Sequence, residues 1–321
     1  MTKKERVPKR IQEVRIDNPS SPGYALRWIN IVDAGRHEIN YFKKKFGFAD
    51  DHLQASISTN IAQRPMVEVK DGYIFIILHF PTFQGEKVVA GEIEFFIGHG
   101  YLITLHNNNL KPLNKFFTYC QEHPQELLAF QTESSSTLLY ELLSRLIRDT
   151  YNILDHNSVN ITETEEIIFD GKPKAAAGKI LTLRRNIINV RKITKNHATI
   201  MQSLQEMKSN LVPRESIQRH YEDLEEHSRQ IWDILDMQRE LVEALHDTNE
   251  SLLNNKTNDI MMMLTIFSVL MLPLTLITGI FGMNAKDMPI VNHSNGFWII
   301  TGIMLASLLG LLSLFKRNKW L

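Results

Sequence analysis

The chain has 321 residues, enough for one large soluble domain and a small membrane unit. Its 36 basic and 36 acidic side chains cancel, which argues against nucleic acid and against strongly acidic partners. The single cysteine, Cys120, excludes a disulfide framework and a cysteine-based metal site. The first ten residues are basic and polar without an apolar segment behind them, so we do not expect a secretory signal there.

Residues 1–133 predict an α+β domain. Strands are expected at residues 24–32, 72–80, 92–97 and 101–105, the last two joined as a hairpin by a short glycine-containing turn. Helices are expected at residues 36–46, 111–122 and 124–130, and Gly47 is a stop signal for the first of them. The pattern indicates a small sheet with helices packed on it.

Residues 134–212 change to long helical patterns. Apolar stripes run through residues 136–160 and 174–208, and the segment 171–173 breaks the helix between them. After a second break near Pro213, neither proline nor glycine occurs until Pro273, so one helix is predicted from Pro213 to Phe281. At 1.5 Å per residue this helix would be about 100 Å long. Its apolar stripe in residues 213–259 predicts a stalk that packs against other helices or subunits.

Two uncharged apolar runs follow, at residues 260–281 and 297–315. A bilayer core of ~30 Å requires roughly 20 helical residues, so both runs are predicted to cross a membrane. The alternative, a buried hairpin in a soluble core, is disfavoured because two adjacent runs without a charge are rare there. In the tail, residues 316–321, Lys316, Arg317 and Lys319 predict a cytoplasmic C-terminus. Two spans then place the N-terminus in the cytoplasm too, and the loop 282–296 outside.

A polar stripe follows one face of the first span. At alternating steps of three and four residues it contains Asn258, Met261, Thr265, Ser268, Leu272, Thr275 and Gly279. The same line continues toward the N-terminus through Asn254, Ser251 and Asp247. Polar groups inside membranes usually face a bundle interior or water, so the stripe predicts a pore lining. Met261, Leu264 and Leu272 would supply apolar constrictions that gate by dewetting. The alternative is that small and hydroxyl residues only let helices pack closely.

Gly282, Met283 and Asn284 close the first span. Mg²⁺ dehydrates reluctantly, so a filter can bind the hydrated ion through its waters, which requires hydrogen-bond acceptors. The Asn284 side-chain carbonyl and the Gly282 and Met283 backbone carbonyls are such acceptors. Gly282 also permits a sharp exit from the helix. On local chemistry alone, the same residues would serve as a helix cap and turn.

These motifs resemble the CorA magnesium transporters. The resemblance is specific over residues 279–284, 271–275 and 255–258, extends to the tail 316–321, and is looser at 46–48, 63–65 and 73–78. It implies an α/β/α sandwich-like cytoplasmic funnel domain, a long stalk helix and two C-terminal transmembrane helices. It also implies a homopentamer in the lipid bilayer of the inner (cytoplasmic) membrane. Mg²⁺ would be the transported ion and a regulatory ligand, with Co²⁺ and Ni²⁺ as further substrates.

The resemblance also implies roles for individual residues. Gly282, Met283 and Asn284 would form the outer selectivity filter, Asp247 an acidic ring lower in the pore, and Asp223 part of a regulatory Mg²⁺ site between subunits. Lys316, Arg317 and Lys319 would form a basic collar around the gate. One departure stands out: family members often carry a Glu-Asp pair shortly before Arg64-Pro65, and residues 55–60 contain no acidic side chain. The usual partner of Asp223 is therefore missing, which predicts weaker closure by cytoplasmic Mg²⁺ or closure through other ligands.

The sequence also allows three alternatives to a magnesium channel. A zinc transporter of the same superfamily is disfavoured by Met283, because those relatives tend to alter this residue. A non-conducting, membrane-anchored helical scaffold is disfavoured, because an anchor alone does not require the polar stripe. An enzyme is the least favoured alternative, since the sequence has no metalloprotease, nucleophile-elbow, dinucleotide or P-loop motif.

Overall fold

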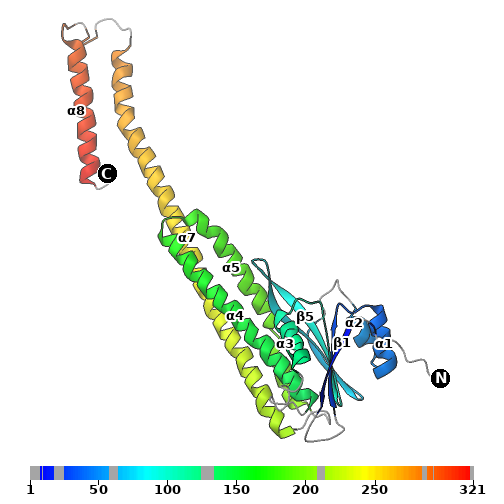
Figure 1. Cartoon of the computed structure of the whole chain (residues 1–321). Helices are drawn as coiled ribbons and strands as arrows, with labels where there is room; N and C mark the ends of the chain where they lie inside the picture. The colour runs from blue at the N-terminus through cyan, green and yellow to red at the C-terminus, as the bar shows by residue number, and fades with distance from the viewer. Residues whose placement is uncertain are drawn as a thin grey trace. The chain divides into compact units, whose positions relative to one another are not determined.

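The structure is a computed structural model that describes residues 8, 10–17, 25–57, 64–123, 134–207, 214–283, 288–291 and 293–318. The chain divides into two compact units, Met1–His246 and Asp247–Leu321. The first unit contains a sheet covered by helices, and the second contains two long apolar helical segments (Figure 1).

The described residues of the first unit form one six-stranded sheet in the order β1-β2-β6-β5-β4-β3. Its strands are β1 (Ile11–Asp17), β2 (Ala25–Val32), β3 (Met66–Lys70), β4 (Tyr73–Gln84), β5 (Lys87–Gly98) and β6 (Tyr101–His106). Neighbouring strands are antiparallel except β2 and β6, which are parallel. Gly72 and Gly85, both with positive φ, allow the tight turns before and after β4.

Helices cover both faces of this sheet. The helices of the unit are α1 (Arg36–Phe46), α2 (Asp50–Ala55), α3 (Lys111–Glu122), α4 (Ser135–Phe169), α5 (Pro173–Thr194), α6 (His197–Glu206) and the first part of α7 (Arg214–Phe281). Side chains alternate along β4, so that Phe75 and Ile77 join a core with α1 and α2, whereas Ile74 and Ile76 join the core with α3 and α4. The three layers confirm the α/β/α architecture (Figure 1).

The long helices α4, α5 and α7 pack against one another within the first unit. Leu224, Ile231 and Leu235 of α7 are buried in the same core as the apolar stripes of α4 and α5. Polar contacts fix the register: the Tyr221 hydroxyl donates to the Ser136 carbonyl at 3.3 Å, and the Gln238 amide donates to the Leu154 carbonyl at 2.7 Å. The part of α7 that lies in the first unit is therefore packed against other helices of the chain.

Several element boundaries differ from the predicted ones. The helices at residues 36–46 and 111–122 and the hairpin of β5 and β6 are confirmed. The strands β1 and β3 were not predicted, because both lie at sheet edges and carry charged side chains such as Glu13 and Glu68. The helix α2 was missed as well. The helix expected over residues 174–208 is two helices, α5 and α6, and the expected helix at residues 124–130 lies outside the described residues.

His197 links the start of α6 to the sheet. Its ring is buried, and Nε2 donates to the backbone carbonyl of His79 on β4 at 2.7 Å. Burial lowers the pKa of His197 to about 4. The break between α5 and α6 thus places a neutral imidazole inside the domain, where protonation is costly.

We predict that this histidine makes the first unit acid-sensitive. An unfolded histidine has a pKa of about 6.5, so between roughly pH 6.5 and 4 the unfolded state binds more protons and stability falls as the pH falls. For His197 the maximal decrease in the free energy of unfolding is about 3 kcal/mol. His197→Gln should flatten the dependence of the thermal unfolding midpoint on pH, measured on the full chain in detergent. The exposed His37→Gln should keep the wild-type slope. Parallel pH profiles for wild type and His197→Gln would contradict this account.

Candidate functional site

The predicted pore residues all lie on one continuous helix. Helix α7 runs from Arg214 to Phe281 and contains Pro273 without interruption. In the single chain the predicted pore residues are exposed: Asn258, Met261, Leu264, Thr265, Ser268, Leu272, Thr275 and Gly279. Leu264 and Leu272 expose 67% and 68% of their surface. An apolar surface of this extent requires lipid or further protein to cover it.

Part of the predicted stripe lines one hollow in the second unit. Ser268, Leu272, Thr275 and Gly279 line a hollow of about 730 Å³ together with Met271, Leu276, Ile280 and Met283. All of these residues except Met283, which follows the end of α7, come from that helix, so the hollow is a concave strip along a single helix and its exit. Half of the predicted pore residues therefore share one surface with Met283 of the predicted filter.

The hydroxyl groups of the span donate to their own helix. Thr265 donates to the Met261 carbonyl at 2.8 Å, and Ser268 donates to the Leu264 carbonyl at 2.9 Å. Thr275 and Thr278 donate in the same way to carbonyls within the preceding turn, each at 2.9 Å. A hydroxyl has one donor hydrogen and two acceptor lone pairs. With the donor engaged inside the helix, each exposed oxygen presents acceptor capacity to its surroundings.

The exit of α7 depends on Gly282. Its backbone N–H donates to the Thr278 carbonyl at 2.8 Å, and the Met283 N–H donates to the Ile280 carbonyl at 3.2 Å. A Cβ atom at residue 282 would lie 2.7 Å from the Thr278 carbonyl oxygen. A side chain there would force the backbone to shift, which supports the predicted need for glycine. Asn284 lies outside the described residues.

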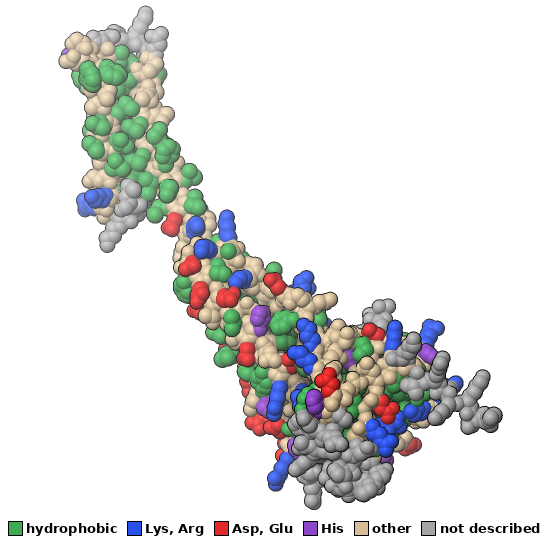
Figure 2. All heavy atoms as spheres, viewed as in Figure 1, with side chains coloured by type: hydrophobic (Ala, Val, Ile, Leu, Met, Phe, Trp, Pro, Cys, Tyr) green, Lys and Arg blue, Asp and Glu red, His purple; other side chains and the backbone are tan. Residues whose placement is uncertain are grey.

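Both predicted spans are helices long and apolar enough to cross a membrane, by length and composition. The second is α8 (Gly296–Arg317), which contains the predicted span 297–315. Figure 2 shows nearly continuous hydrophobic side chains over these segments, whereas charged side chains cover the helices of the first unit. Lys316 and Arg317 are exposed in the last turn of α8, and Lys319 lies outside the described residues.

Asp223 lies on α7 within a polar cluster of the first unit. The Tyr140 hydroxyl donates to its carboxylate at 3.5 Å, and His227 Nε2 lies 3.7 Å away. Burial, and then the negative charge of Asp223, raise the pKa of Tyr140. The Asp223 side chain remains 47% exposed, so its carboxylate can still reach an ion. Asp247 is exposed on the same helix, in the second unit.

The acidic residues near the missing pair have other partners. Asp50 forms an ion pair with Lys43 at 2.6 Å. Asp51 lies instead with His52 and Glu68, in a group whose ligand atoms are all within 4.8 Å of one another. Sequence reasoning missed His52 and Glu68. It had not predicted α2 and β3, and no spacing signal connects these two residues.

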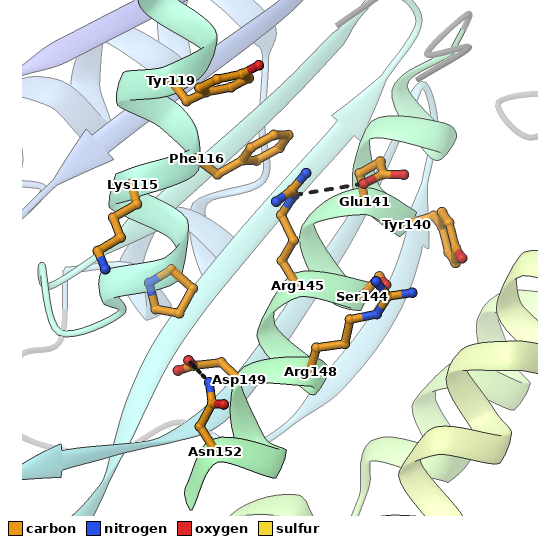
Figure 3. Close-up of a pocket in the computed structure, with 11 residues that line it drawn as sticks. Lys115, Phe116, Tyr119, Tyr140, Glu141, Ser144, Arg145, Arg148, Asp149 and Asn152 are labelled. Carbon is orange, nitrogen blue, oxygen red and sulfur yellow. Dashed lines mark hydrogen bonds and ion pairs between the residues drawn. The ribbon is translucent and has the colours of Figure 1, made fainter. Parts of the chain in front are cut away.

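A cavity of about 880 Å³ lies between α3 and α4 (Figure 3). Its wall contains Lys115, Arg145 and Arg148 as well as Glu141 and Asp149. The Arg145 guanidinium lies 3.8 Å from the Phe116 ring centroid, and its Nε lies 3.8 Å from Glu141. Because the charges are mixed and Arg145 is engaged within the wall, we assign this cavity no role in ion conduction.

Comparison with known proteins connects these features to a family. Residues 24–317 match the family described as CorA-like Mg²⁺ transporter protein. The cobalt/magnesium transport protein CorA of Methanocaldococcus jannaschii is 26% identical, over 97% of this chain and 96% of the relative. The corresponding protein of Thermotoga maritima is also 26% identical, over 92% of this chain and 83% of its own length.

A solved structure has the same fold over nearly the whole chain. The complete CorA magnesium transporter from Methanocaldococcus jannaschii matches with a TM-score of 0.84 at 24% identity, covering 96% of this chain and 98% of that one. The likeness confirms the predicted fold class, with a domain, a stalk helix and two candidate spans. Because the family match covers both units, the chain belongs to the CorA-like Mg²⁺ transporter family.

Proposed function

We propose that this protein is a passive, membrane-potential-driven Mg²⁺ channel of the inner membrane that also accepts Co²⁺ and Ni²⁺. Family membership and the names of the relatives, which refer to magnesium and cobalt transport, support the substrate. The observation that carries the mechanism is a stripe of hydroxyl groups along the apolar part of α7. Each hydroxyl in this stripe donates its hydrogen to a carbonyl of the same helix.

The stripe suits a hydrated cation. The waters around Mg²⁺ direct their hydrogens outward, so a favourable wall offers acceptors and few donors. The hydroxyl oxygens of Thr265, Ser268 and Thr275 offer acceptors because their hydrogens are bonded to helix carbonyls. An anion on the same path would meet no free donor from these three groups. The wall therefore favours cations without carrying a charge inside the membrane.

The outer end of this helix supplies the proposed filter. Met283 continues the strip that begins at Ser268, and in the sequence Gly282 precedes it and Asn284 follows it directly. In our proposal these residues contact the waters of the ion and not the ion itself, since stripping Mg²⁺ is costly. Leu264 and Leu272 would form apolar constrictions in the closed state. No ATP is required, because an inside-negative potential of 100 mV supplies a divalent ion with ~4.6 kcal/mol.

We further propose a homopentamer with both termini in the cytoplasm. The exposed apolar strip of one chain would then face a shared axis, and residues 282–296 would lie outside. Residues 1–133 and 134–212 would form the cytoplasmic domain and 213–259 the stalk. Asp247 would form an acidic ring, Lys316, Arg317 and Lys319 a basic collar, and Asp223 part of a site where cytoplasmic Mg²⁺ favours the closed pore.

The filter is tested by Mg²⁺ uptake into proteoliposomes under an inside-negative potential. Asn284→Ala should reduce uptake by roughly tenfold or more, because loss of the side-chain carbonyl raises the entry barrier by about 1.4 kcal/mol. Asn295→Ala removes an asparagine from the same loop and should behave like the wild type. If well-folded wild type takes up none of Mg²⁺, Co²⁺ and Zn²⁺, the channel proposal is wrong. The alternative of a non-conducting, membrane-anchored scaffold is then favoured.

The geometry of the helix exit gives a second prediction. Gly282→Ala should impair uptake about as strongly as Asn284→Ala, because its Cβ meets the Thr278 carbonyl at 2.7 Å. Gly302→Ala on α8 adds the same methyl group at a helical position where no described atom beyond the adjacent helix backbone lies within 4 Å, so uptake should persist. The protein would be checked for intact folding by circular dichroism. Equal uptake by Gly282→Ala and Gly302→Ala would contradict the proposed role of Gly282 at the end of α7.

Regulation is tested at Asp223. Raising Mg²⁺ inside the proteoliposomes should inhibit the wild type, and Asp223→Asn should need at least about fivefold more Mg²⁺ for half-inhibition. Asp233→Asn, on the same helix and exposed, is the matched control. An unchanged midpoint in Asp223→Asn would show that this carboxylate takes no part in regulation.

A further inference from the structure

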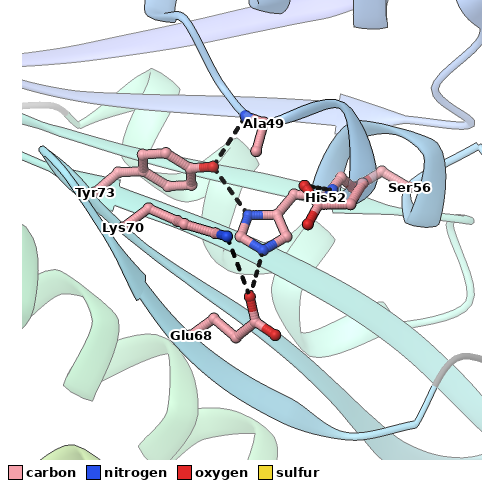
Figure 4. A network of polar contacts seen from close by, with 7 residues as sticks. Ala49, His52, Ser56, Glu68, Lys70 and Tyr73 are labelled. Atoms are coloured by element: carbon pink, nitrogen blue, oxygen red, sulfur yellow. Dashed lines mark hydrogen bonds and ion pairs between the residues drawn. The ribbon is translucent and has the colours of Figure 1, made fainter.

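His52 of α2 is held in a fixed orientation inside the first unit. Only 2% of its surface is exposed, and its ring stacks on Phe75 with the centroids 4.2 Å apart. Its Nδ1 lies 2.9 Å from the Tyr73 hydroxyl, which accepts a hydrogen bond from the Ala49 N–H at 3.0 Å. Figure 4 shows this chain of contacts running from Ala49 through Tyr73 to one side of the imidazole.

The other ring nitrogen points toward a carboxylate at the protein surface. His52 Nε2 lies 2.8 Å from Glu68 Oε2, and Glu68 is 42% exposed. The exposed Asp51 completes the group, with one ligand atom from each residue within 4.8 Å of the others. The carboxylate of Asp51 accepts a hydrogen bond from the His52 N–H, which lowers the pKa of Asp51. A buried nitrogen and two ionisable carboxylates thus converge from α2 and β3, with access from solvent.

We propose that Asp51, His52 and Glu68 bind a divalent transition-metal ion such as Zn²⁺, Co²⁺ or Ni²⁺. Imidazole with carboxylates suits these ions, whereas Mg²⁺ prefers oxygen ligands alone. The contact of Nδ1 with Tyr73 corresponds to the outer partner that metal-binding histidines use to fix their orientation. Three protein ligands leave a coordination position for water.

Metal binding requires small movements. Ligand bonds of ~2.0–2.2 Å would place the ligand atoms on the order of 3–3.5 Å apart, closer than the present limit of 4.8 Å. The exposed Asp51 and Glu68 side chains can rotate to close this gap while His52 stays fixed. To bind the ion through Nε2, the neutral imidazole carries its single proton on Nδ1, which donates to the Tyr73 oxygen, and any second proton on Nε2 is released to solvent. Lys70 Nζ, now 4.0 Å from Glu68, is the competing cation.

This site is separate from the proposed transport route. It lies in the first unit, whereas the pore strip lies in the second, and it contains neither Asp223 nor any filter residue. It differs in selectivity as well, because its imidazole discriminates against Mg²⁺.

The test is calorimetric titration of Zn²⁺ into the full chain in detergent with a large excess of Mg²⁺. The excess keeps all-oxygen sites occupied by Mg²⁺, so the remaining heat reports nitrogen-containing sites. The wild type should bind one Zn²⁺ per chain. Glu68→Gln and Asp51→Asn, both at partly or fully exposed positions, should weaken binding by at least about tenfold. Asp50→Asn changes the neighbouring carboxylate that pairs with Lys43 and should bind like the wild type.

Two results would overturn the site. One is no binding of Zn²⁺ by the wild type, which would leave His52 and Glu68 as a hydrogen-bonded pair only. The other is the same affinity in wild type, Glu68→Gln and Asp51→Asn, which would place the ion elsewhere. His52→Gln should not bind Zn²⁺, provided that circular dichroism shows this variant to be folded. If the variant does not fold, Glu68→Gln and Asp51→Asn decide whether the site exists. Mg²⁺ uptake by the same variants should stay at the wild-type level, so failure of this site and failure of the channel are distinguishable.

Discussion

Polar groups inside an apolar helix must find partners, and the first span meets this constraint within itself. Thr265, Ser268 and Thr275 donate to carbonyls of the preceding turn, so no donor hydrogen of these residues faces the membrane or its neighbours. The helix can then expose oxygens along one side and hydrocarbon along the rest. The proposed cation preference and the proposed assembly of several copies around an axis both depend on this division of the helix surface.

The same helix carries both classes of proposed site. Helix α7 is continuous for 68 residues. It contains Asp223, which contacts Tyr140, and all of the strip from Ser268 except Met283, which follows the helix end. Its first part is buried against α4 and α5, whereas its apolar C-terminal part is uncovered in a single chain. A regulatory ion at the stalk and a gate in the membrane would therefore act on one covalently continuous element.

Sequence reasoning succeeded where a strong physical pattern extends over many residues. Uncharged runs locate both spans, and the spacing of Thr265, Ser268 and Thr275 identifies their common face, because a helix repeats every 3.6 residues. It failed where the pattern is short or depends on tertiary contacts. The edge strand β3 has only five residues, so the alternation of Val67 and Val69 with charged residues is too short to stand out as a strand. The approach of His52 to Glu68 depends on the packing of α2 on the sheet, which no local spacing encodes.

The most direct test of the central claim is whether the hydroxyl stripe lines a water-filled path. Cysteine would be placed at Ser268 and Thr275, and at Leu270 and Ile277 on the opposite face, in a Cys120→Ala background. Burial raises the pKa of the native Cys120 thiol to about 12, so its replacement should have little effect on reactivity. The account predicts that a charged, membrane-impermeant thiol reagent modifies Ser268→Cys and Thr275→Cys and blocks Mg²⁺ uptake, while the opposite-face variants remain unmodified. Modification of both faces alike, or of the opposite face only, would contradict a pore along this stripe.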